Sequence, residues 1–119
     1  MEEKRCILVV EDEPLVSDVV AEALSERYRA IQVGTAAEAV QRLRTGECDL
    51  VLLDRLLPGG GAADVQQLAE EMHISVVLMS GDPEWNAHAA SSGHPFIAKP
   101  FTIDDLLRTI EIALGARGD

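Results

Sequence analysis

Aromatic and basic side chains are both scarce in this sequence of 119 residues. Aromatic residues make up 3% of it, and 10 basic residues stand against 21 acidic ones. With so few rings, a core must be built from aliphatic side chains, and a hydrophobic content of 47% suffices for one such core. The net charge of −11 argues against direct binding to nucleic acid or to an anionic membrane. It suits a basic partner, a bound cation or plain solubility.

Cysteines and long apolar runs are also few. The two cysteines, Cys6 and Cys48, form neither a CxxC pair nor a metal-ligand spacing, so we expect free thiols in a reducing compartment. The first apolar run, residues 6–10, is shorter than the hydrophobic part of a signal peptide, and acids follow it at once. Because no stretch approaches the length of a membrane span, we expect a cytoplasmic protein without membrane insertion.

Five short segments have the character of β-strands. Three are continuous apolar runs, as in strands that are buried on both faces, and two are weaker candidates. The strong segments are residues 6–10, 50–53 and 76–79, and the weak ones are residues 29–33 and 96–98.

Helical periodicity fills the gaps between these strands. Apolar stripes run through residues 16–24, 36–43, 62–72 and 103–114, and a further helix begins near residue 83. Thr35, Asp82 and Thr102 stand where helix N-caps are expected. Strict alternation of strand and helix predicts right-handed crossovers and a parallel sheet with helices on both faces. We expect one domain over residues 1–119, with a core at about 5–115 and a frayed tail at 116–119.

The fourth helix is the least regular of the predicted elements. The stretch between Ser80 and Lys99 is short, and Pro95 disfavours a helical conformation at His94. The sequence therefore predicts a short or irregular fourth helix.

Polar side chains follow four of the predicted strands. Glu11 and Asp12 come after the first strand, Asp54 after the third, Ser80 after the fourth and Lys99 after the fifth. In open α/β sheets, ligand sites form beyond the carboxyl ends of the strands. We therefore expect these side chains to meet at one edge of the sheet.

The chemistry of this set points to a metal ion and a phosphoryl group. Three neighbouring carboxylates repel one another, and a hard divalent cation such as Mg²⁺, or Mn²⁺ in its place, relieves the repulsion. Lys99 adds a second positive charge. Together, a metal ion and an ammonium group can offset the charge of a phosphoryl group while a carboxylate oxygen attacks it.

Four motifs carry a resemblance to a known family. They are residues 8–13, LVVEDE, residues 54–59, DRLLPG, residues 79–81, MSG, and residues 96–101, FIAKPF. In this order and at these strand ends, they resemble the receiver domain of two-component response regulators over nearly the whole chain. The resemblance implies a flavodoxin-like (βα)5 fold, a doubly wound, five-stranded parallel sheet with strand order 2-1-3-4-5.

The resemblance also implies roles at the acidic edge. Asp54 is expected to accept a phosphoryl group from a histidine kinase or a histidine phosphotransfer protein. Asp12, Asp54 and the backbone carbonyl of Leu56 are expected to bind Mg²⁺ directly, and Glu11 through a water molecule. Lys99 is expected to contact the phosphoryl oxygens.

A switch is implied next to this acceptor. Ser80 is expected to hydrogen-bond the new phosphate, and Phe96 to move into the space that Ser80 vacates. The Lys99–Pro100 peptide bond is expected to be cis, as is usual in receivers.

Two features depart from the family pattern, and the role of a third residue stays open. Arg55 follows the acceptor where many receivers have an apolar residue, and we expect it to be solvated unless it meets a partner protein or pairs with Glu11, Glu13 or Glu84. The glycines at residues 59–61 predict a flexible loop over the site. Trp85, the only tryptophan, has two interpretations, an anchor for a partner and a cap over the core.

The leading hypothesis is a stand-alone phospho-receiver that is not a conventional enzyme and acts through an unknown downstream protein as a monomer or weak dimer. Two alternatives stay open, a pseudo-receiver that docks without phosphorylation and a phosphate sink in a phosphorelay. The sequence argues against two other functions. A phosphatase of the haloacid-dehalogenase type needs an acid two residues after its nucleophile, where this chain has Leu56. A flavin-binding module needs a Ser-, Thr- and Gly-rich loop after the first strand, where this chain has the acidic residues 11–13.

Overall fold

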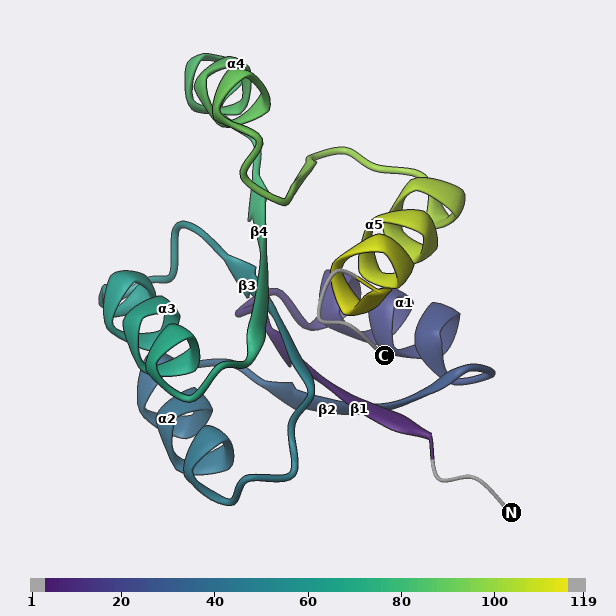
Figure 1. Ribbon diagram of the computed structural model, residues 1–119, viewed down its shortest axis with the longest axis vertical. Helices are drawn as coiled ribbons and strands as arrows, with labels where there is room; N and C mark the ends of the chain where they lie inside the picture. Colours follow the sequence, from purple (N-terminus) through teal and green to yellow (C-terminus); the bar gives the residue numbers. More distant parts are fainter. Residues whose placement is uncertain (1–3, 116–119) are drawn as a thin grey trace.

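The computed structural model describes residues 4–115, and the tail predicted to fray, 116–119, lies outside the described residues. Strands and helices alternate strictly along the chain, as predicted (Figure 1). The elements are β1 (Arg5–Val10), α1 (Pro14–Leu24), β2 (Tyr28–Val33), α2 (Ala36–Arg44), β3 (Leu50–Asp54), α3 (Ala62–Glu71), β4 (Ser75–Ser80), α4 (Pro83–Ser92), β5 (Phe96–Ala98) and α5 (Ile103–Gly115).

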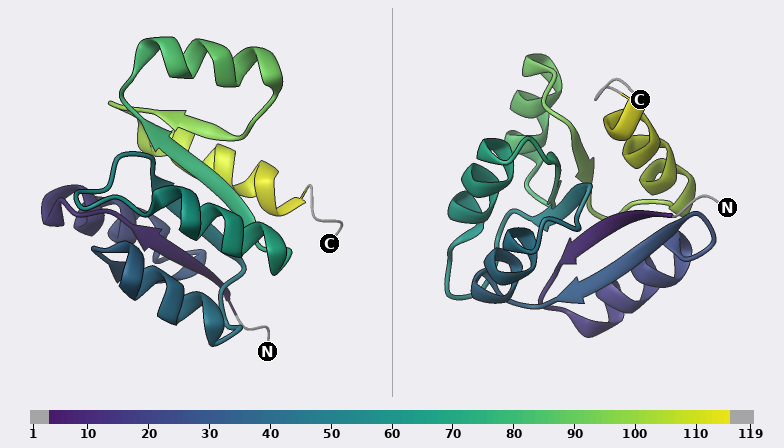
Figure 2. Two further views of the ribbon diagram at one scale, coloured as in Figure 1. Left: turned by 90° about the vertical axis from the view of Figure 1, so that its left-hand side faces the viewer. Right: turned by 60° about the horizontal axis from the view of Figure 1, so that its bottom comes forward.

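All five strands form one parallel sheet in the order β2-β1-β3-β4-β5. Helices α1 and α5 cover one face, and α2 and α3 cover the other (Figures 1 and 2). The flavodoxin-like fold and its strand order are therefore confirmed. This strand order reverses direction between β1 and β3, which is the place where doubly wound sheets hold their ligands.

The core has two aliphatic halves, one on each face of the sheet. Strand β1 shows why, because alternate side chains point to opposite faces. Leu8 and Val10 pack with α2 and α3, whereas Ile7 and Val9 pack with α1 and α5. All four are fully buried, as a strand in the middle of a covered parallel sheet requires.

Helix caps lie where the sequence predicts them. The Thr35 hydroxyl accepts a hydrogen bond from the N–H of Glu38, and the Thr102 hydroxyl accepts one from the N–H of Asp105. The Asp82 carboxylate accepts the N–H groups of Glu84 and Trp85 at the start of α4. Each cap satisfies backbone donors that have no partner within the helix.

Helix α4 differs from the prediction of a short or irregular element. It has ten residues, as many as α3, and it ends regularly at Gly93, whose φ of 78° is left-handed. Pro95 lies beyond that end and does not interrupt the helix. The apolar pattern was a poor guide because α4 stands at the edge of the fold (Figure 1) and buries only Ala89.

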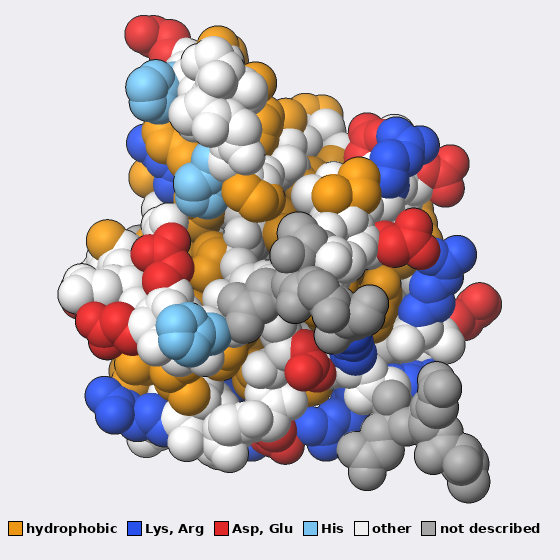
Figure 3. Space-filling model, in the orientation of Figure 1, with side chains coloured by type: hydrophobic (Ala, Val, Ile, Leu, Met, Phe, Trp, Pro, Cys, Tyr) orange, Lys and Arg blue, Asp and Glu red, His pale blue; other side chains and the backbone are white. Residues whose placement is uncertain are grey.

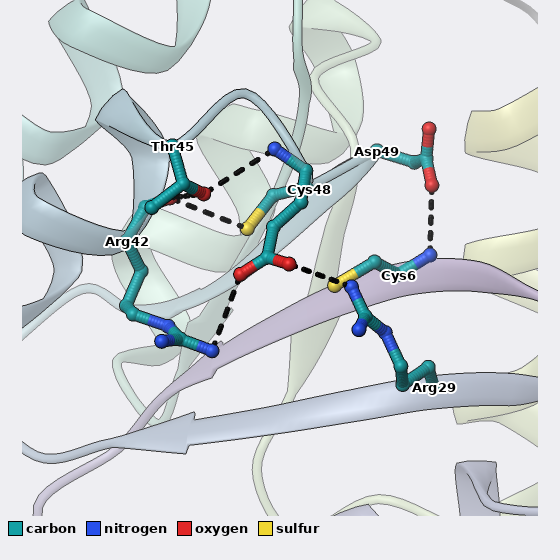
Figure 4. Close-up of polar contacts among 7 residues, drawn as sticks. Cys6, Arg29, Arg42, Thr45, Cys48 and Asp49 are labelled. Carbon is teal, nitrogen blue, oxygen red and sulfur yellow. Dashed lines mark hydrogen bonds and ion pairs between the residues drawn. The ribbon is translucent and has the colours of Figure 1, made fainter.

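A polar network lies at the amino ends of the strands, opposite the edge that holds the predicted site (Figure 4). Glu47 pairs with both Arg29 and Arg42, at N–O distances of 2.9 and 3.2 Å. Cys6 and Cys48 lie buried beside this network as free thiols, as predicted. Among the residues that the structure describes, no helix is both long and apolar enough to cross a membrane.

Candidate functional site

The carboxyl ends of two strands, β1 and β3, bring the three predicted acids together. Asp54 is the last residue of β3, and Glu11 and Asp12 follow β1 directly. A carboxylate oxygen from each of the three lies within 4.8 Å of the others. Glu11 and Asp54 are buried, at 3% and 8% exposure, whereas Asp12 is exposed. The acidic cluster thus has a buried floor and an open side.

Lys99 directly follows the carboxyl end of β5, and its side chain extends into this cluster. Its ammonium group donates to Glu11 Oε1 at 2.8 Å and to Asp54 Oδ2 at 3.1 Å. Burial lowers the pKa of Lys99, but the bonds to Glu11 and Asp54 outweigh it and raise the pKa above its usual value. Lys99 therefore stays charged and joins both buried acids. The Lys99–Pro100 peptide bond is cis, as expected.

The carboxyl group of Glu11 has a pKa above its usual value, so its ionisation is disfavoured. Burial raises the pKa of its carboxyl group, and the neighbouring charge of Asp54 raises it further. The bond from Lys99 and the N–H of Glu13, which donates to Glu11 Oε2 at 3.2 Å, offset this only in part. Further positive charge at this place would favour the ionised form.

The donor set fits a hard divalent cation. Carboxylate oxygens are the ligands that Mg²⁺ prefers, and three acids converge here from two strand ends. Asp54 Oδ1 also accepts the N–H of Leu56 at 3.0 Å, so the loop after β3 folds back over the Asp54 carboxylate. The carbonyl of Leu56 as a metal ligand stays a prediction.

Ser80 and Phe96 lie on the same face of neighbouring strands. Phe96 pairs with Leu78 in the register of β4 and β5, and Ser80 lies two residues further along β4. The Ser80 hydroxyl is buried and accepts the N–H of Asp82 at 3.1 Å. Phe96 is only half-buried, against the core on the α2 and α3 side.

Arg55 makes contacts that sequence reasoning missed. Its guanidinium carbon lies 4.8 Å from the centre of the Trp85 ring, and its Nη1 lies 3.8 Å from Asp82 Oδ2. Neither a solvated side chain nor pairing with Glu11, Glu13 or Glu84 describes this arrangement. Trp85 itself packs against the core, half-buried. Arg55 directly follows β3, and Trp85 lies in the first turn of α4, after the neighbouring strand β4. The sequence therefore brings both residues to the same edge of the sheet but does not indicate their contact.

The chain matches one family description, "Response regulator receiver domain", over residues 7–111. It is 32% identical to the transcriptional regulatory protein CutR of Streptomyces coelicolor over 93% of this chain and 54% of the relative. It is 31% identical to the phosphate regulon transcriptional regulatory protein PhoB of Escherichia coli over 92% of this chain and 52% of the relative. The chain spans about half the length of the curated relatives it matches.

Solved structures of the same fold are numerous. A response regulator receiver protein from Sinorhizobium medicae superposes with a TM-score of 0.83, at 23% identity, over 97% of this chain and 98% of that one. A CheY-like receiver domain protein from Methanospirillum hungatei gives a TM-score of 0.82, at 23% identity, over 97% of both chains.

Proposed function

Because the chain belongs to the response regulator receiver domain family, we propose that Asp54 accepts a phosphoryl group from a phosphohistidine in a Mg²⁺-dependent reaction. The donor is a histidine kinase or a histidine phosphotransfer protein. The observation that carries the proposal is the contact of Lys99 with both Glu11 and Asp54 inside the acidic cluster. Such a site can hold a phosphoryl anion and the carboxylate that attacks it.

Each residue has a separate task in this reaction. A carboxylate oxygen of Asp54 forms a bond to phosphorus while the bond from phosphorus to the donor histidine nitrogen breaks, and that nitrogen keeps the electron pair. A donor ring protonated at its other nitrogen then leaves as neutral imidazole, and Asp54 carries an acyl phosphate. Lys99 lies within hydrogen-bond distance of Asp54 and offsets charge on the transferred oxygens. Asp12, Asp54 and Glu11 would hold Mg²⁺, which supplies further positive charge to the phosphoryl group when bound.

Phosphorylation would be read out through Ser80 and Phe96. A phosphoryl group adds about one to two negative charges and strong acceptor oxygens. Ser80 presents a hydroxyl at the end of the next strand, and this hydroxyl would exchange the N–H of Asp82 for the phosphate. Phe96 on β5 would then follow into the vacated volume, and the surface around α4 would change.

Apolar side chains beside the site suit a protein donor. Leu15 on α1 is 80% exposed and Val19 is 55% exposed. Together with Phe101 they line a groove that also contains Lys99. Exposed leucines and valines next to a buried acceptor would give a phosphohistidine-bearing protein a surface to bind while its imidazole reaches Asp54.

The test uses a small-molecule acyl phosphate as donor and intact-protein mass spectrometry as readout. With Mg²⁺ present, the wild-type chain should gain one phosphoryl group, and Asp54→Asn should gain none. Asp49→Asn is the matched control, because Asp49 precedes the same strand at its opposite end. Labelling that persists in Asp54→Asn would defeat the assignment, and a wild-type chain that never labels would favour a pseudo-receiver.

A further inference from the structure

Arg55 joins the loop after β3 to the first turn of α4. Its side chain is 29% exposed, with the guanidinium over the face of Trp85 and beside the carboxylate of Asp82. A cation over an indole face and an ion pair at the same side chain both favour this one conformation. The charge of Arg55, one residue after the acceptor, is thus held on α4.

Trp85 connects this arginine to the aromatic side chain of β5. The Trp85 ring meets the Phe96 ring edge-to-face, with centres 5.9 Å apart and planes at 89°. The Trp85 ring also contacts the ring of His94, which lies beyond the end of α4, with ring centres 6.3 Å apart. Any displacement of Phe96 therefore changes a contact of the tryptophan on which Arg55 lies.

The same turn of α4 is bonded to Ser80. The N–H of Asp82 donates to the Ser80 hydroxyl at 3.1 Å, and Asn86 Nδ2 donates to the Ser80 carbonyl at 3.2 Å. Apart from these bonds, α4 has little apolar packing against the rest of the fold, because Ala89 is its one buried residue. A helix with so little apolar burial is positioned largely by these few contacts.

We propose that Arg55 is a positioning residue that holds Trp85 and the first turn of α4 in their unphosphorylated arrangement, so that Phe96 moves only when its contact with Trp85 is broken. The inference rests on the proposed function. When Ser80 turns toward a phosphate, the N–H of Asp82 loses its acceptor, and a moving Phe96 leaves the edge of Trp85. Contacts made in one state and lost in the other bias the equilibrium toward the first.

The experiment measures the affinity for beryllofluoride with Mg²⁺, a stable analogue of the aspartyl phosphate. Fluorine NMR of the bound analogue gives the dissociation constant of every variant without use of the tryptophan. Arg55→Met keeps an apolar side chain over Trp85 and removes the charge. We expect it to bind the analogue about two- to five-fold more tightly than the wild type.

Two further variants isolate the cause. Asp82→Asn keeps a side-chain oxygen that caps α4 and removes the charge paired with Arg55, so it should shift the affinity in the same direction by a smaller factor. Arg27→Met removes an ion pair of equal N–O distance, 3.8 Å, between Arg27 and Glu111, and should leave the affinity unchanged.

Trp85 supplies an independent reading, because it is the only tryptophan. Its emission should change when the analogue binds to the wild type. In Arg55→Met without the analogue, the emission should already have moved part of the way. If Arg55→Met is poorly folded by circular dichroism, Arg55→Lys, which keeps the charge and loses the planar group, should show a smaller shift in the same direction.

The outcomes separate this inference from the proposed function. Equal affinity of Arg55→Met and the wild type overturns the inference and leaves the phosphoryl site intact. Weaker binding by Arg55→Met also overturns it, since Arg55 would then serve the phosphoryl group itself. A wild-type chain that binds no analogue removes the proposed function, and the inference falls with it.

Discussion

Lys99 is the residue that lets two buried carboxylates share one edge of the sheet. Among residues 4–115, it is the basic side chain that donates to Glu11 and Asp54, and both distances are those of charge-assisted hydrogen bonds. Without it, two acids would face each other in a poorly solvated place. The close approach of Glu11 and Asp54 therefore depends on the ammonium group of Lys99.

We predict that Lys99→Met lowers the rate of phosphorylation by a small-molecule donor about 100-fold. Removal of the ammonium group takes away a preorganised positive charge from the oxygens where negative charge develops. Stopped time courses read by intact mass give the rate. Lys4→Met removes an exposed lysine that bonds a backbone carbonyl, and it should label like the wild type. A Lys99→Met rate within a factor of two of the wild type would contradict this role.

The ionisation of the Cys48 thiol is coupled to folding. Burial, together with the neighbouring Cys6 thiol, raises its pKa from the usual 9.0 to about 12. A pKa that is higher in the folded than in the unfolded chain gives stability that is complete below 9.0 and is lost as the pH rises toward about 12. The thiol is thus a buried apolar group at neutral pH.

We predict that the free energy of unfolding of the wild type falls between pH 9 and pH 11 relative to that of Cys48→Ala, by up to about 1 kcal/mol per pH unit. Denaturant titrations at several pH values measure the difference. Val51→Ala shortens a fully buried side chain in the same half of the core without a titratable group. Its stability should run parallel to the wild type, and parallel curves for Cys48→Ala as well would refute the linkage.

The site residues show how far sequence reasoning extends at this scale. Strand ends fix the positions of Glu11, Asp54 and Lys99, because parallel strands in register bring them to one edge. The roles given to them by resemblance stay proposals. The stacking of Arg55 on Trp85 was out of reach, because the conformation of a long side chain depends on contacts that no local pattern encodes.

At the scale of elements, the start of α3 at Gly61 lies close to the start of α2 at Ala36. The φ of Gly61 is 93°, and a Cβ built there would lie 2.5 Å from the Cβ of Ala36. Neither the backbone conformation nor the space admits a side chain. The loop that the sequence marks as flexible is therefore fixed at its last glycine by packing against α2.

We predict that Gly61→Ala costs about 1–3 kcal/mol more in the free energy of unfolding than Gly60→Ala. Gly60 has a similar φ of 80°, but a Cβ there meets nothing within 4 Å. Both variants share the backbone strain, so the difference reports the close approach to Ala36. Equal losses in urea denaturation would mean that α2 and α3 move apart at no cost.

Elements with strong patterns were predictable, and the weakly patterned one was not. Buried strands and capped helices follow from apolar runs and from residues such as Thr35 and Thr102. Helix α4 lacked such a pattern, because an edge helix with one buried residue needs no apolar stripe. Its true end signal was Gly93, two residues before the proline that suggested an interruption.

At the scale of the whole molecule, the charges that make up the net charge of −11 affect stability differently at the surface and at the acidic cluster. On the face shown in Figure 3, acidic and basic side chains lie beside one another. Exposed ion pairs contribute little to stability, and the pair of Arg108 and Asp105 is an example. At the acidic cluster, in contrast, Glu11 and Asp54 are buried, so their repulsion is poorly screened. A cation bound there should act on the stability of the entire fold.

We predict that Mg²⁺ at about 100 times its dissociation constant raises the free energy of unfolding by about 2.7 kcal/mol. The reason is that the folded cluster would bind the ion and the unfolded chain would not. In Asp12→Ala the same concentration should have a much smaller effect, whereas Asp18→Ala, an exposed acid on α1, should respond like the wild type. Equal Mg²⁺ responses in Asp12→Ala and the wild type would place the metal elsewhere.

The most direct test of the account locates the acyl phosphate within the chain. The protein is phosphorylated with a small-molecule donor and Mg²⁺, reduced with borohydride, which converts an aspartyl phosphate to homoserine, and mapped by peptide mass spectrometry. Phosphorylation of Asp54 predicts homoserine at position 54 alone. Conversion at Glu11, at Asp12 or at any other acid, with Asp54 left intact, would contradict it.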